Sequence, residues 1–98
     1  MIILLVNYKV AKGKNIELLK ALYESGFVET TRNEDGNISY EYFLPEKDDG
    51  TTLFLVEKWR DKEAFEAHIG AENMKIAQNL KVEFDATTEL KKFEATEI

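Results

Sequence analysis

The sequence contains a single histidine, His68, and no cysteine, so few of its side chains could carry out catalysis. Histidine is the one side chain whose ordinary titration falls near neutral pH, and proton transfer is therefore the first chemistry to consider. Two roles remain open for His68. It could be a proton acceptor or donor in a site, or a buried imidazole held by hydrogen bonds inside the core.

Asn7 is the second candidate, because it interrupts the most hydrophobic stretch of the chain. A buried amide without partners costs about 1–3 kcal/mol, so Asn7 should either be hydrogen-bonded or point into a pocket. Trp59, the only tryptophan, could close the core or form a pocket wall. Tyr40 could donate a hydrogen bond to an anionic ligand, or simply pack. Glu57 shares a strand face with Trp59 and is alone weak support for acid–base chemistry.

Composition disfavours several classes of site and partner. Without cysteine there is no thiolate nucleophile, iron–sulfur cluster or cysteine zinc site. One histidine, no metal-binding spacing and no glycine-rich phosphate loop lead us to expect no metal and no cofactor. The net charge of −6 disfavours nucleic acid and anionic membrane surfaces as partners. The apolar start lacks the features of a signal peptide, and we expect a cytoplasmic protein.

The hydrophobic pattern of the 98 residues predicts a single domain, 1–98, with the order βαββαβ. The expected strands are 2–10, 38–44, 51–59 and 88–95, the last at a sheet edge. One helix should run from an N-cap at Asn15 to about Arg32, and a second should begin at Asp61 and be interrupted by Gly70. This is the α+β, ferredoxin-like antiparallel sheet with helices on one face.

The first and third predicted strands are apolar on both faces, although helices would cover only one. A bare apolar sheet face invites aggregation in a monomer. The simplest cover is the same face of a second copy, and the sequence therefore predicts a homodimer.

Two segments identify a family resemblance. Residues 57–68, E-K-W-R-D-K-E-A-F-E-A-H, resemble the E-x-W-x-[DS]-x-x-A-[FL]-x-x-H segment of the antibiotic biosynthesis monooxygenase (ABM) domain. Residues 36–41, G-N-I-S-Y-E, resemble the start of that family's second strand. The resemblance covers nearly the whole chain and implies a dimeric α+β barrel, with a pocket between sheet and helices in each protomer.

Many members of that family are cofactor-free oxygenases of phenols or dihydroquinones, while others isomerise small sugar-like signals, degrade haem, or have no known activity. Our leading expectation is a cofactor-independent monooxygenase of a small aromatic or quinol substrate. His68 would accept or donate the proton, and Asn7 and Tyr40 would bond substrate oxygens. Trp59 and Phe65 would line the pocket.

Two alternatives stay open: an isomerase or tautomerase of a small carbonyl metabolite, and a non-catalytic dimer that binds a small aromatic or quinone-like ligand. Haem breakdown is disfavoured. The haem-degrading relatives place an iron-binding histidine where this sequence has Gln78, a poor iron ligand.

Overall fold

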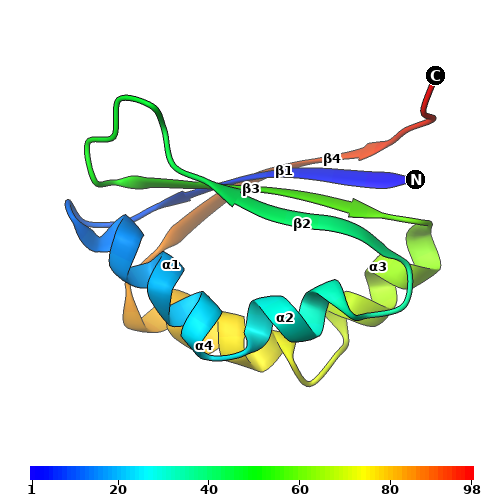
Figure 1. The fold of residues 1–98 in the computed structure, drawn as a ribbon, viewed down its shortest axis with the longest axis horizontal. Coiled ribbons are helices and arrows are strands. Elements are labelled where there is room, and N and C mark those ends of the chain that lie inside the picture. The colour runs from blue at the N-terminus through cyan, green and yellow to red at the C-terminus, as the bar shows by residue number, and fades with distance from the viewer.

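The computed structural model describes all residues, 1–98, and contains four strands and four helices (Figure 1). In chain order they are β1 (Ile2–Lys9), α1 (Lys14–Glu24), α2 (Phe27–Arg32), β2 (Asn37–Phe43), β3 (Thr52–Trp59), α3 (Lys62–Ile69), α4 (Met74–Glu83) and β4 (Thr87–Glu94). The strands form one antiparallel sheet in the order β2-β3-β1-β4, with all helices on one face. The predicted ferredoxin-like fold is confirmed. None of the helices has the length and apolar character needed to cross a membrane.

The core lies between the sheet and the helices. Strand alternation turns Leu4 and Val6 of β1 toward the helices, opposite Glu57 and Leu55 of β3. The helices contribute Leu18 and Phe27, among other buried side chains. Each fully buried large apolar side chain contributes about 1.5–3 kcal/mol relative to its exposed state, so this layer supplies the main driving force for folding.

The predicted helix 15–32 is in fact two helices. Gly26 has a φ of 84°, a left-handed conformation that glycine adopts at little cost and that ends α1. The Ser25 hydroxyl donates to the Leu22 carbonyl and accepts from the Phe27 amide, which fixes the corner. The new direction of α2 lets Phe27 become fully buried.

The expected N-cap at Asn15 is wrong, because Gly13 occupies that position and Asn15 lies within α1. Its side chain is fully buried, and its amide donates to the Asp48 carboxylate at 2.8 Å and the Thr52 carbonyl at 3.0 Å. Asn15 thereby ties α1 to the β2–β3 hairpin. The buried side of α1 consists of Asn15, Leu18 and Leu22, whereas Ile16 and Tyr23 are exposed.

Helix α3 begins as predicted, since the Asp61 carboxylate accepts a 2.8 Å hydrogen bond from the Ala64 amide. Gly70 follows its last residue, also as predicted. From this start Ala64 and His68 fall on the buried side of α3. Ile69, the last residue of α3, is 50% exposed.

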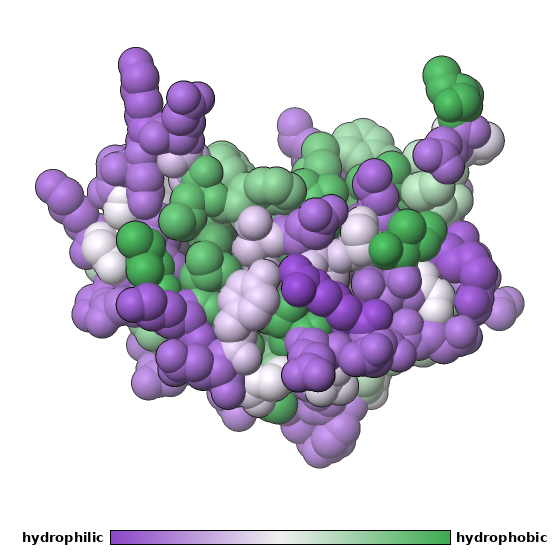
Figure 2. All heavy atoms as spheres, viewed as in Figure 1, coloured by the Kyte–Doolittle hydropathy of each residue, from purple (hydrophilic) through white to green (hydrophobic).

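The other face of the sheet bears no helix. Leu5, Phe54 and Phe93 lie on it, from three adjacent strands, and each is between 38% and 47% exposed. Hydrophobic side chains are visible on the upper side of Figure 2, where Figure 1 places the sheet. The prediction that β1 and β3 are apolar on both faces is confirmed. β4 is the predicted edge strand.

Gly36, in the turn between α2 and β2, packs closely against α3, and substitution can test this contact. It has a φ of 81°, and a Cβ added there would collide with the Cβ of Ala64. Gly26 has a similar φ but open space around it. We expect Gly26→Ala to lower the free energy of unfolding by about 1–2 kcal/mol from backbone strain alone. Gly36→Ala should cost about 1–3 kcal/mol more because of overpacking. Equal losses in chemical denaturation would contradict this close packing.

Candidate active site

A cavity of about 380 Å³ lies between the helix-covered face of the sheet and helices α3 and α4. Its apolar wall includes Leu4, Val6 and Phe65. Its polar groups come from every side: Tyr8, Tyr40, Glu57, His68, Lys81, Thr88 and Lys92. The volume falls in the lower part of the range for small-molecule sites, and the mixture of apolar walls with a few polar groups is typical of them.

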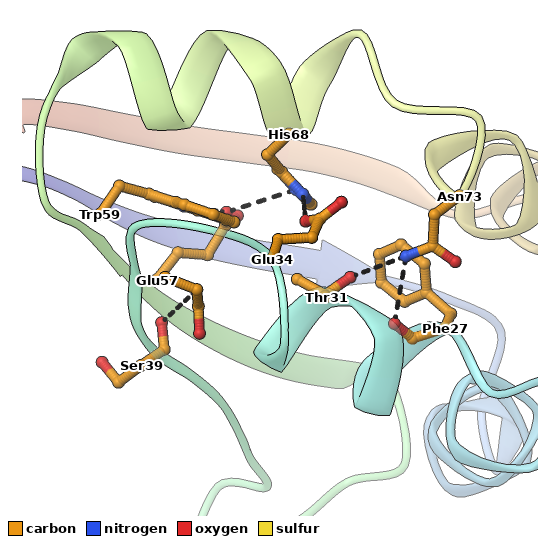
Figure 3. Close-up of polar contacts among 9 residues, drawn as sticks. Phe27, Thr31, Glu34, Ser39, Glu57, Trp59, His68 and Asn73 are labelled. Atoms are coloured by element: carbon orange, nitrogen blue, oxygen red, sulfur yellow. Dashed lines mark hydrogen bonds and ion pairs between the residues drawn. The ribbon is translucent and has the colours of Figure 1, made fainter.

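His68 reaches this cavity from α3 and is held by a second element. Its Nδ1 lies 2.6 Å from Oε1 of Glu34, which belongs to the turn after α2 (Figure 3). An ionised carboxylate can only accept a hydrogen bond, so the imidazole must donate from Nδ1. In the neutral ring Nε2 is then the unprotonated nitrogen, which is the form required of a general base.

Glu57 faces the second nitrogen of this imidazole. Its Oε1 lies 3.9 Å from His68 Nε2, beyond direct hydrogen-bond distance, and accepts a 3.1 Å bond from Trp59 Nε1. Burial raises the pKa of the Glu57 carboxyl, although the Trp59 hydrogen bond and the nearby His68 and Lys81 act in the opposite direction. Glu57 is therefore a second group that could hold or release a proton beside His68.

Trp59 lies behind this pair and does not line the cavity. It is fully buried, and its ring stacks on the His68 ring with centroids 4.5 Å apart and planes inclined by 28°. The same indole donates to Glu57. Instead of forming the expected pocket wall, Trp59 holds both proton-transfer candidates in place.

Two tyrosines complete the polar lining. Burial raises the pKa of both Tyr8 and Tyr40, with a smaller contribution from the charge of Glu57. Both phenols therefore stay protonated at neutral pH and can donate hydrogen bonds to a ligand oxygen. The Tyr40 ring also packs edge-on against His68, at 5.8 Å between centroids.

Asn73 fixes the loop between α3 and α4, the two helices that cover the cavity. Its amide donates to Thr31 Oγ1 at 3.0 Å and to the Phe27 carbonyl at 3.3 Å (Figure 3). The loop is thereby attached to α2, the helix that precedes the Glu34 turn. The Glu34 turn and the α3–α4 loop consequently both depend on the position of α2.

Asn7 does not share the pocket, and the expectation that it does is wrong. On β1, Asn7 pairs with Phe54 of the neighbouring strand β3. It lies between Val6 and Tyr8, which face the helices, so its own side chain lies on the bare face of the sheet. Its Oδ1 is buried there without a hydrogen-bond partner.

Of the predicted site residues, His68, Tyr40 and Phe65 line the cavity, whereas Asn7 and Trp59 do not. Sequence reasoning overlooked Tyr8 and Lys81. A signal for Tyr8 was available, since it has the same strand parity as Leu4 and Val6. Glu34 carried no such signal, because it lies in a polar turn, and its contact with His68 spans 34 positions of sequence. No group of three or more histidine, aspartate or glutamate side chains is arranged to hold a metal ion.

The model of the antibiotic biosynthesis monooxygenase family matches residues 1–80, and the chain belongs to this family. No protein with a curated description matches the sequence. Among solved structures, a candidate antibiotic biosynthesis monooxygenase from Deinococcus radiodurans is 20% identical, with a TM-score of 0.85 over 100% of this chain and 95% of that one.

Two further structures have the same fold. SnoaB from Streptomyces nogalater, a cofactor-independent oxygenase, is 12% identical, with a TM-score of 0.81 over 99% of this chain and 94% of its own. A conserved protein of unknown function from Bacteroides thetaiotaomicron is 23% identical, with a TM-score of 0.82 over 96% of each chain. At these identities the likeness is one of fold.

The raised pKa of Glu57 leads to a stability prediction. A carboxyl whose pKa is raised by folding contributes fully below its ordinary value of 4.5, and this contribution is lost as the pH rises through the folded-state pKa. Glu57→Gln should therefore have a higher free energy of unfolding than the wild type at about pH 8, and the difference should shrink toward about pH 5.

Urea denaturation across this pH range measures the effect. Glu66→Gln, which changes a carboxylate that is 62% exposed on α3, is the matched control and should stay within about 0.5 kcal/mol of the wild type. A Glu57→Gln protein that is less stable than the wild type at the alkaline end would contradict the prediction.

Proposed function

We propose that this protein is a cofactor-independent monooxygenase that oxidises a small aromatic or quinol substrate with O₂. The observation that carries the proposal is the His68–Glu34 pair at the cavity, with Nδ1 occupied by the carboxylate. Membership of the antibiotic biosynthesis monooxygenase family supports the same chemistry. The apolar walls suit an aromatic ring, and the tyrosine hydroxyls suit its oxygens.

In this reaction the substrate supplies its own electrons. His68 Nε2 takes the proton of a ring hydroxyl, and the phenolate passes one electron to O₂. The two radicals combine at a ring carbon to give a hydroperoxide. Cleavage of its O–O bond expels water and leaves a new carbonyl, so that a dihydroquinone and O₂ give a hydroxyquinone and H₂O. Tyr8 and Tyr40 orient the ring oxygens, and the apolar wall limits access of water.

The proximity of Glu57 to His68 supports a second candidate. Two proton-transfer groups 3.9 Å apart could remove a proton from one atom of a small carbonyl compound and return it to another. Such an isomerase or tautomerase would work without oxygen. Product formed under strict anaerobiosis would select this candidate over the monooxygenase.

The central prediction concerns His68. His68→Ala should lower turnover of a dihydroquinone by about 10²-fold or more, because the general base is lost. Glu34→Gln should lower it less, since the imidazole remains but its Nδ1 proton is no longer held by a charge. Product formation under ¹⁸O₂, followed by mass spectrometry, measures turnover and oxygen transfer together.

The control for both variants is Glu29→Gln, an exposed glutamate on α2 that should leave turnover unchanged. If His68→Ala keeps full turnover while remaining folded by circular dichroism, the base assignment fails. If the wild-type product contains no label from O₂, the monooxygenase assignment fails.

We also propose that the protein is a homodimer joined through the bare face of the sheet. The exposed apolar side chains of this face support the proposal, as does the unpartnered Asn7 Oδ1 among them. A shallow hollow there is lined by residues of β1, β3 and β4, Leu5 and Phe54 included. A second copy would remove this surface from water.

Light scattering after size exclusion tests the assembly. The wild type at micromolar concentration should have twice the chain mass of 11.3 kDa. Leu5→Glu, which places a charge at the centre of the face, should shift the protein to the monomer. Glu17→Gln on the helix-covered side should remain dimeric. A wild-type monomer at this concentration would exclude the proposal.

A further inference from the structure

The balance of basic and acidic side chains that line the cavity differs from that of the whole chain. The chain carries 13 basic and 19 acidic side chains, yet the cavity is lined by two lysines and only one carboxyl group, that of Glu57. By its lining residues, the cavity therefore has more basic than acidic side chains within an acidic protein.

Lys81 is the more enclosed of the two lysines. It extends from α4 and is only partly exposed, whereas Lys92 on the edge strand β4 is exposed. Its Nζ lies 5.6 Å from the centre of the Tyr8 ring and forms neither an ion pair nor a hydrogen bond with any group of the chain. By contrast, Lys14, Lys62 and Lys75 on the helix surfaces each pair with a glutamate.

An unpaired ammonium group at a partly buried position is costly unless something else neutralises it. Burial lowers the pKa of Lys81, which reports the same cost. The charge of Glu57 opposes this lowering of the Lys81 pKa, but no carboxylate of the chain lies within ion-pair distance of Lys81 Nζ. The partner that the geometry leaves room for is a group on the ligand.

Lys81 and His68 reach the cavity from different helices, α4 and α3. Lys81 lies by Tyr8, whereas His68 lies by Glu57, which stands opposite Leu4 in the sheet. A ligand that contacts both side chains can therefore do so through two substituents, an anionic group beside Lys81 and a hydroxyl group beside His68.

We propose that Lys81 is a specificity residue that binds a carboxylate on the substrate, so that the natural substrate class is a phenol or hydroquinone bearing an acidic side arm. The inference rests on the proposed function for the identity of the ring, but its basis in charge is independent of catalysis. A carboxylate–ammonium bond in a partly buried site discriminates against the uncharged analogue by about tenfold or more.

Anaerobic isothermal titration calorimetry tests this without any turnover. The two probes are homogentisate, a hydroquinone with an acetate arm, and ethylhydroquinone, which has an arm without the carboxylate. The wild type should bind homogentisate at least about tenfold more tightly. Lys81→Met should abolish this preference, and Lys81→Arg should retain most of it because the charge remains. Lys75→Met, an exposed lysine of α4, is the matched control and should leave the preference unchanged.

Equal affinity of the wild type for the two probes would overturn the proposal, as would a preference that survives in Lys81→Met. The outcome is separable from that of the proposed function. A preference that depends on Lys81, in a protein that transfers no oxygen, would leave Lys81 as an anion-binding residue while refuting the monooxygenase.

Discussion

The contact between His68 and Glu34 is the interaction on which the rest of the site depends. It joins α3 to the turn after α2, two segments that the chain brings together only when the whole helix layer has folded. Asp61 determines where α3 begins, and therefore which face His68 occupies. Gly36 allows the turn to approach Ala64 closely enough for Glu34 to reach the ring. The stacked Trp59 then leaves the imidazole a single orientation.

The sheet divides the molecule into two surfaces with different tasks. Its inner face bears the cavity, where burial keeps the tyrosines protonated and favours the neutral form of Glu57. Its outer face bears exposed apolar side chains and Asn7. One strand therefore supplies both surfaces through its two-residue period, and a single step along β1 moves a side chain from one to the other.

Local sequence patterns predicted most of the fold but only part of the candidate site. Strand and helix order, the cap at Asp61 and the doubly apolar strands followed from local pattern, and the structure agrees with them. Asn7 was conspicuous as a polar break, but its parity with Leu5 places it on the outer face. The break of the first helix at Gly26 was missed because the apolar spacing continues across it. Glu34 and Lys81 meet the cavity only through tertiary packing, which local patterns do not encode.

The most direct test of the account is the protonation pattern of the only histidine, measured by ¹⁵N NMR on uniformly labelled protein with the imidazole in its neutral form. Because the sequence contains no other histidine, the ring signals need no residue assignment, and their couplings to the two ring carbon protons distinguish Nδ1 from Nε2. We predict a protonated Nδ1 and an unprotonated Nε2, and loss of this preference in Glu34→Gln. A neutral ring protonated at Nε2 would contradict the role of Glu34 and remove the base from the proposed reaction.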